Sequence, residues 1–81
     1  MRAIQIDQTG GPEVLQLGDL TLGDPRAGEI RVRNVAIGVN FIDTYHRTGL
    51  YPLDLPAVLG VEGAGVVDAV GPSVASFAVG D

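Results

Sequence analysis

Glycine occurs twelve times in the 81-residue sequence, and this frequency limits the folds that the chain can adopt. Glycine is unfavourable inside helices and is favoured where the backbone turns tightly or approaches another segment closely. Short apolar stretches lie between the glycines, and 46% of all residues are hydrophobic, which favours a folded chain over a disordered one. Together these features predict a mainly β structure rather than a helical bundle.

Polar and apolar residues alternate with the period of a strand in residues 2–7 and 14–20, and residues 29–39 and 63–70 also predict strands. Residues rich in Gly, Pro, Asp and Ser separate them and predict turns or loops: 9–12, 23–28, 50–56 and 71–73. Gly65 lies inside the last strand and indicates a bend or bulge there. Residues 77–81 predict a turn that leads into a further strand, so we expect the chain to be cut within a domain.

One short helix is predicted from Phe41 to Arg47. Asn40 precedes it and has the side chain of a good N-cap residue. Asp43 falls in the first turn, where the helix dipole favours a negative charge, and Gly49 ends the helix.

Charge and composition exclude several classes of function. The net charge of −5 disfavours nucleic acid as a partner, because basic residues supply most of that affinity. The sequence has no cysteine and one histidine, so it cannot build a structural zinc site. No apolar run is long enough to span a membrane, and Met1–Asp7 lacks the core of a signal peptide, so we expect a cytoplasmic protein.

The segment Gly60–Gly65 resembles a nucleotide-binding loop only superficially. A dinucleotide fingerprint needs Gly-x-Gly-x-x-Gly between a strand and a helix. Here the glycine spacing is reversed and Val66 and Val67 follow, so a turn with a bend in a strand is the prediction.

A denser polar cluster occurs around the predicted helix. Asn40 and Asp43 are three residues apart, and Tyr45 and Tyr51 add rings with hydroxyl groups that suit a flat organic ligand. The residues alone leave two interpretations open, a ligand site or a helix cap with packing tyrosines. His46 is interpreted as an exposed residue at the helix end rather than as a base.

Four segments resemble the quinone oxidoreductases, the zeta-crystallin-like, zinc-free branch of the medium-chain dehydrogenase/reductase superfamily. These are Gly10–Leu15 (GGPEVL), Ala36–Tyr45 (AIGVNFIDTY), Arg47–Pro52 (RTGLYP) and Leu59–Val67 (LGVEGAGVV). The resemblance implies a GroES-like, partial β-barrel with a short helix, left incomplete over residues 1–81. It also implies that the Rossmann nucleotide-binding domain lies outside this chain.

The resemblance further implies chemistry without a metal. In zinc-dependent relatives a Cys and a His occupy the positions of Asn40 and Val61, and neither of these side chains can replace those ligands. Glu62 matches a glutamate beside that zinc position, and we expect it to have a structural role. NADPH is the implied cofactor, because the nicotinamide carries the hydride while the protein supplies positions and hydrogen bonds.

Carried over residue by residue, the resemblance implies catalytic roles for Asn40, Tyr45 and Tyr51, and contacts to the cofactor from Asn40 and Asp43. Arg47 matches a common family residue without a defined role. The implied function is reduction of a quinone or related conjugated carbonyl by a homodimeric parent enzyme. An enoyl or alkenal reductase and a non-enzymatic, crystallin-like or binding relative are the alternatives, and we expect the 81-residue chain alone to be inactive.

Overall fold

The computed structural model describes all residues, 1–81, and divides into two compact units. The first unit joins Met1–Thr21 to Gly38–Val61, and the second joins Leu22–Ile37 to Glu62–Asp81. Each unit therefore combines two segments that are separate in the sequence. We describe each unit by itself.

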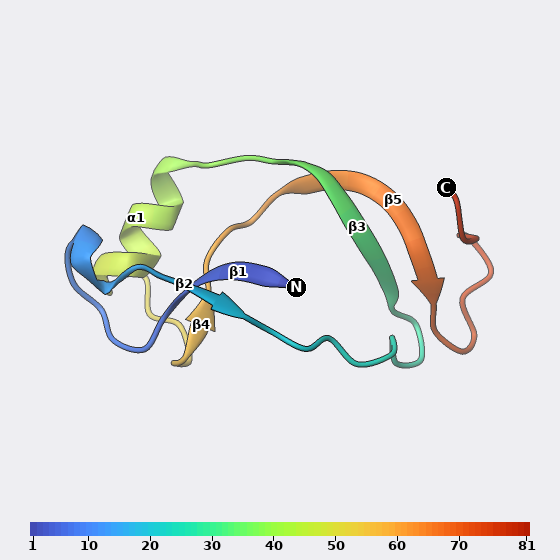
Figure 1. Ribbon diagram of the computed structural model, residues 1–81, viewed down its shortest axis with the longest axis horizontal. Coiled ribbons are helices and arrows are strands. Elements are labelled where there is room, and N and C mark those ends of the chain that lie inside the picture. Colours follow the sequence, from blue (N-terminus) through green and yellow to red (C-terminus); the bar gives the residue numbers. More distant parts are fainter. The chain divides into compact units, whose positions relative to one another are not determined.

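The first unit contains a three-stranded antiparallel sheet in the order β2-β1-β4 (Figure 1). Its strands are β1 (Arg2–Ile6), β2 (Gln16–Asp19) and β4 (Ala57–Val58). Ile6 at the end of β1 is completely buried, and Val14 is 5% exposed. These two aliphatic side chains form the core of this unit.

The second predicted strand is shorter than expected because a turn of 3-10 helix, η1 (Pro12–Val14), occupies its beginning. Proline fixes its own backbone angle and is favoured at the first position of a helix. The N–H of Val14 donates to the Gly11 carbonyl at 3.1 Å, and the resulting turn carries Val14 out of the sheet and into the core. The strand β4 was not predicted, because two residues are too few to show an alternating pattern.

The first unit also contains the only helix, α1 (Phe41–Thr48). The predicted helix is thus confirmed, with Asn40 as its N-cap residue. It ends at Gly49, whose φ of 90° lies in the left-handed region that glycine adopts without strain. The predicted loop of residues 50–56 follows.

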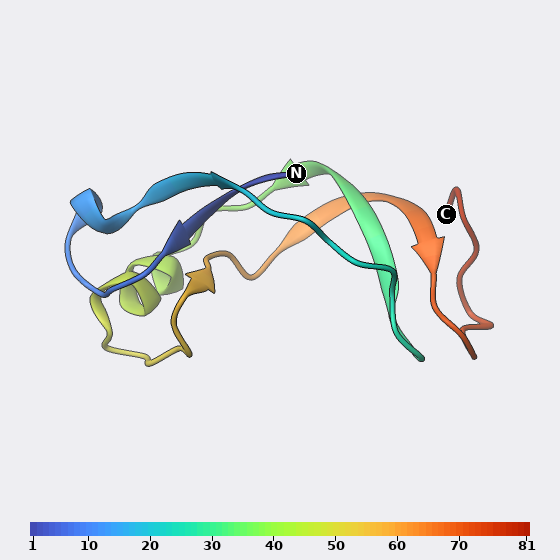
Figure 2. The same ribbon diagram turned by 60° about the horizontal axis from the view of Figure 1, so that its bottom comes forward.

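The second unit contains the antiparallel pair β3 (Ile30–Ile37) and β5 (Gly63–Val70), which run side by side in Figure 2. The register shifts twice, once where Val35 is inserted opposite Gly65 and Ala64, and once at Asp68. The irregularity predicted near Gly65 is confirmed, although the inserted residue belongs to the partner strand. Val67 in β5 is 5% exposed and is the buried residue of this unit.

The end of the chain folds onto β5 within the second unit. The N–H of Gly80 donates to the Val67 carbonyl, and the N–H of Val67 donates to the Asp81 carbonyl, both at 2.8 Å. The turn predicted for residues 77–81 is confirmed at Val79 and Gly80.

Arg31 and Arg33 share one face of β3, as the alternating pattern predicts, and both approach Asp68 on β5. Arg31 Nε lies 2.7 Å from Asp68 Oδ1, and Arg33 Nη2 lies 3.7 Å from Asp68 Oδ2. The hydrogen bond to Asp68 and its negative charge raise the pKa of Arg31 above its ordinary value. Solvent reaches both side chains of this ion pair, which weakens its contribution to stability.

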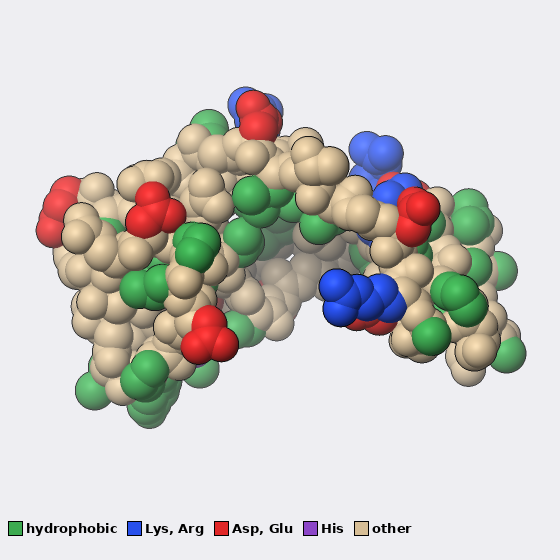
Figure 3. Space-filling view, turned by 90° about the horizontal axis from the view of Figure 1, so that it is seen from below, with side chains coloured by type: hydrophobic (Ala, Val, Ile, Leu, Met, Phe, Trp, Pro, Cys, Tyr) green, Lys and Arg blue, Asp and Glu red, His purple; other side chains and the backbone are tan.

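Many large apolar side chains remain on the surface, and Figure 3 shows some of them in green. The most exposed are Val39 at 90%, Phe41 at 83% and Val35 at 81%. The helix α1 has neither the length nor the apolar character needed to cross a membrane.

Gly65 provides a test of the β3–β5 ladder. A Cβ atom at Gly65 would collide with the Arg33 carbonyl oxygen and lie 2.8 Å from Asn34 Cα, so the backbone must move to accept it. We expect Gly65→Ala to lower the free energy of unfolding by about 1–3 kcal/mol in urea titrations. Gly23→Ala is the matched control, because a Cβ there meets no atom within 4 Å. Equal unfolding midpoints for the two variants would contradict this account of the ladder.

Candidate functional site

The amino-terminal end of α1 joins two of the residues that the sequence singled out. The backbone N–H of Asn40 donates to Asp43 Oδ2 at 2.9 Å, and the two residues form a capping box. A capping box satisfies backbone N–H groups that a helix leaves without partners in its first turn. Asn40 and Asp43 therefore have a structural role, whatever else they do.

The two side-chain oxygens of Asp43 differ in their hydrogen bonds. Oδ1 is buried and has no hydrogen-bond partner, whereas Oδ2 accepts the Asn40 N–H. A buried acceptor without a partner is unfavourable, so natural proteins retain few of them. Oδ1 of Asp43 is thus an acceptor that no other group of the protein uses.

Tyr45 and Tyr51 are also brought together. Their ring centroids are 5.4 Å apart with an interplanar angle of 81°, an edge-to-face arrangement. The turn at Gly49 produces this pair, because the N–H of Tyr51 donates to the Tyr45 carbonyl at 3.2 Å. The side chains stay 38% and 50% exposed, so the pair offers aromatic surface and hydroxyl groups to a ligand.

His46 was predicted to be exposed, and the structure corrects this prediction. The residue is half-buried, and its ring lies 6.4 Å from that of Tyr51 at an angle of 61°. The chain reverses at Gly49 and lays Tyr51 back over the end of the helix, which the linear sequence does not reveal. The structure thus gives His46 a packing contact with a candidate site residue.

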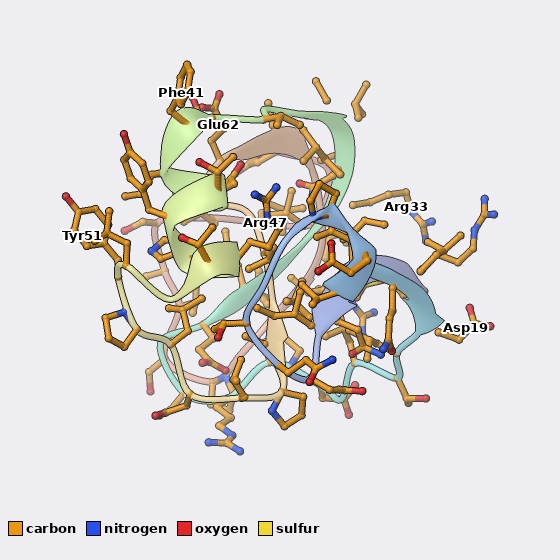
Figure 4. All side chains as sticks on the ribbon, turned by 90° about the vertical axis from the view of Figure 1, so that its left-hand side faces the viewer. Asp19, Arg33, Phe41, Arg47, Tyr51 and Glu62 are labelled. Carbon is orange, nitrogen blue, oxygen red and sulfur yellow. The ribbon has the colours of Figure 1, made fainter.

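Arg47 forms a contact that the sequence did not predict. Its Nε–H donates to the Gly10 carbonyl at 3.2 Å, and the Gly10 N–H donates to the Arg47 carbonyl at 2.9 Å. Figure 4 shows Arg47 on the side of α1 that faces the turn before η1, whereas Tyr51 projects away from that turn. The only signal in the sequence was the turn predicted for residues 9–12, which gave no indication of its partner.

The remaining sequence candidates lie in or beside β5. The glycine-rich segment runs into this strand from Gly63 onward, so the prediction of β structure rather than a strand-to-helix phosphate loop is confirmed. Glu62 directly precedes β5 and belongs to the second unit, and its position relative to Asn40 stays a prediction. No three His, Cys, Asp or Glu side chains are grouped as metal ligands would be.

The β-sheets, which do not close, and the one short α-helix agree with one family. The model of the alcohol dehydrogenase GroES-like domain matches residues 26–81. The chain therefore belongs to the alcohol dehydrogenase GroES-like domain family, and the predicted fold class is confirmed.

Individual similar proteins indicate which kinds of enzyme in this family the chain resembles. The chain is 57% identical to a quinone oxidoreductase of Pseudomonas aeruginosa over 81 residues, which is 99% of this chain and 25% of that protein. The crystal structure of Escherichia coli quinone oxidoreductase complexed with NADPH superimposes with a TM-score of 0.97 at 51% identity, over 100% of this chain and 25% of that one. A 2-haloacrylate reductase from a Burkholderia species is 47% identical over 83 residues, 98% of this chain and 25% of that protein.

The chain thus spans about a quarter of the length of these relatives. The resemblance to quinone oxidoreductases, read from four sequence segments, is confirmed over essentially the whole chain.

The capping box yields a prediction about stability. Asp43→Ala removes the acceptor of the Asn40 N–H and should lower the free energy of unfolding by about 1 kcal/mol. Asp43→Asn keeps an acceptor oxygen and should lose less. Asp54→Ala, in the exposed loop after the helix, is the control and should change little. Thermal unfolding of the three variants makes the comparison, and a loss for Asp54→Ala equal to that for Asp43→Ala would rule out the cap as the cause.

Proposed function

We propose that this chain forms part of the catalytic domain of an NADPH-dependent quinone oxidoreductase that needs no zinc. The observation that carries the proposal is the match along the whole chain to quinone oxidoreductases, at 57% identity to one relative and with a TM-score of 0.97 to a structure that contains NADPH. We further propose that a Rossmann domain outside these residues binds most of the cofactor.

Asp43 supports the fit of this chain to NADPH. Its Oδ1 is a buried acceptor without a partner, and the nicotinamide end of NADPH carries amide and hydroxyl donors. Asn40 and Asp43 would hold that end of the cofactor. When bound, the cofactor supplies the hydride for reduction.

Asn40, Tyr45 and Tyr51 are the proposed catalytic residues. The amide of Asn40 and the hydroxyl groups of the tyrosines can donate hydrogen bonds to a quinone oxygen, on which negative charge develops during reduction. The edge-to-face pair of Tyr45 and Tyr51 fixes both rings, and its exposed surface suits a flat conjugated substrate. Fixed donors stabilise developing charge without reorganising during the reaction.

A quinone is the proposed substrate rather than an alkenal or enoyl compound, because three relatives that are 53%, 56% and 57% identical to this chain are quinone oxidoreductases, whereas the 2-haloacrylate reductase is 47% identical. The expectations of a homodimer, of a cytoplasmic location and of no nucleic acid or membrane partner rest on the resemblance and the charge, and they belong to the same proposal.

The substrate proposal is tested on the full-length enzyme. We expect NADPH oxidation to be fastest with quinones, and slower by at least an order of magnitude with 2-alkenals and with 2-haloacrylate. Steady-state kcat/KM values for the three classes decide the question, since they measure transition-state stabilisation for each substrate. A preference for either of the other classes would contradict the proposal.

Asn40 requires variants that separate its two roles. Asn40→Asp retains a good N-cap residue but replaces the amide donor with a carboxylate, whereas Asn40→Ala removes both. We expect each substitution to lower kcat by about 10²-fold, since that is the usual effect of removing one hydrogen-bond donor to a developing charge. Only Asn40→Ala should also lower the melting temperature. Unchanged kcat in Asn40→Asp would remove Asn40 from the site.

Tyr51→Phe tests the hydroxyl group of the second tyrosine, because the substitution keeps the ring and its pairing with Tyr45. We expect a smaller kcat with an unchanged melting temperature. Wild-type kinetics in this variant would leave Tyr51 with a packing role alone.

A further inference from the structure

The helix that carries the candidate site has few connections to the core of its unit. None of the eight residues of α1 is fully buried, so packing alone does not fix its position. The core of this unit consists of Ile6, at the end of β1, and Val14, at the end of η1. Gly10 lies in the turn between these two buried residues, and the core therefore anchors it at both sides.

Arg47 connects this anchored turn to the helix. The residue and Gly10 exchange two hydrogen bonds, from Arg47 Nε to the Gly10 carbonyl at 3.2 Å and from the Gly10 N–H to the Arg47 carbonyl at 2.9 Å. The neighbouring contact is also close, because a Cβ atom at Gly49 would lie 3.2 Å from Thr9 Cγ2. The end of α1 thus lies against residues 9 and 10, through Arg47 on Gly10 and through Gly49 on Thr9.

This connection lies close to the proposed catalytic residues in the chain. Arg47 follows Tyr45 by two residues, and the Tyr45 carbonyl accepts the N–H groups of both Gly49 and Tyr51. A rotation of the last helical turn would therefore move both tyrosines of the edge-to-face pair together. Small displacements of groups that align a substrate are costly, and an error of about 1 Å can lower the rate about 10²-fold.

We propose that Arg47 is a positioning residue, which holds α1 against the Gly10 turn and thereby sets the place of Tyr45 and Tyr51 in the site. The inference rests on the proposed quinone reduction. Arg47 does not itself contact the substrate. It acts through the helix, because its Nε–H donates to the Gly10 carbonyl and joins α1 to that turn.

The test uses Arg47→Met and Arg47→Lys in the full-length enzyme. Met keeps much of the aliphatic stem but cannot donate to Gly10, whereas the Lys ammonium group can. We expect kcat for quinone to fall about 10- to 100-fold in Arg47→Met, with little change in the KM for NADPH, and to recover in part in Arg47→Lys. Arg2→Met is the matched control, because Arg2 is an exposed arginine on β1.

Hydrogen exchange supplies a second measurement. In Arg47→Met the amide hydrogens of Gly10 and Gly49 should exchange faster than in the wild type, while that of Gln5 in β1 should not. If Arg47→Met does not fold, Arg47→Leu, which also lacks a hydrogen-bond donor, is judged by the same change in kcat.

The outcomes separate the two proposals. A wild-type enzyme that does not reduce quinones would overturn the proposed function and this inference with it. An active wild type, with Arg47→Met that melts at a lower temperature but keeps its kcat within twofold, would overturn the positioning role alone. A loss of kcat that Arg47→Lys does not relieve at all would also overturn it.

Discussion

The hydrogen bonds at the two ends of α1 are the interactions on which the candidate site depends. Helices shorter than about 12–15 residues are marginal in water, and this one has eight residues and no fully buried side chain. Asp43 accepts the Asn40 N–H at the first turn. At the last turn the N–H groups of Gly49 and Gly10 donate to the carbonyls of Tyr45 and Arg47. Without these bonds we expect the segment to lose its helical conformation, and Tyr45 and Tyr51 to lose their edge-to-face contact.

The structural roles and the proposed chemical roles therefore fall on the same residues. Asn40 is both the N-cap residue and the proposed donor to the substrate, and Asp43 is both a partner in the capping box and the proposed contact to the cofactor. Asparagine suits such a double role, because its side chain has an acceptor oxygen for capping and a separate donor group. A loss of activity on substitution to alanine would thus have two possible causes, and only variants that keep one role can distinguish them.

Local rules were sufficient for the parts of the fold that depend on neighbouring residues. The helix from Phe41, its cap at Asn40 and its end at Gly49 follow from residue types within one turn of each other. The strands β1, β3 and β5 were predicted from their residues, the first two with ends that moved by one or two residues and β5 with the same bounds. Val14 was misplaced because Pro12 starts a 3-10 turn, which an alternating pattern does not reveal.

Contacts across the sequence could not be predicted in the same way. The bonds between Arg47 and Gly10 join residues that are 37 positions apart, and no residue type at either position indicates the other. Asn40 and Asp43 were correctly grouped because they lie on one helical turn, whereas the pairing of Tyr45 with Tyr51 depends on the chain reversal after Gly49. The sequence alone grouped these residues and the family resemblance implied their roles, but neither supplied their geometry.

The two side-chain oxygens of Asp43 differ in their hydrogen bonds, and the difference bears on its proposed contact to the cofactor. Oδ2 is used by the backbone of Asn40, and this bond fixes the carboxylate in one orientation. Oδ1 is left buried without a partner, at a cost that the positive end of the helix dipole reduces because it favours negative charge there. A cofactor donor bonded to Oδ1, as the proposed function requires, would remove this cost, and because Oδ1 is buried the atoms that cover it must move to admit the donor. The affinity gained in this way depends on the cap, so the stability of the first turn and the binding of the ligand are coupled through a single carboxylate.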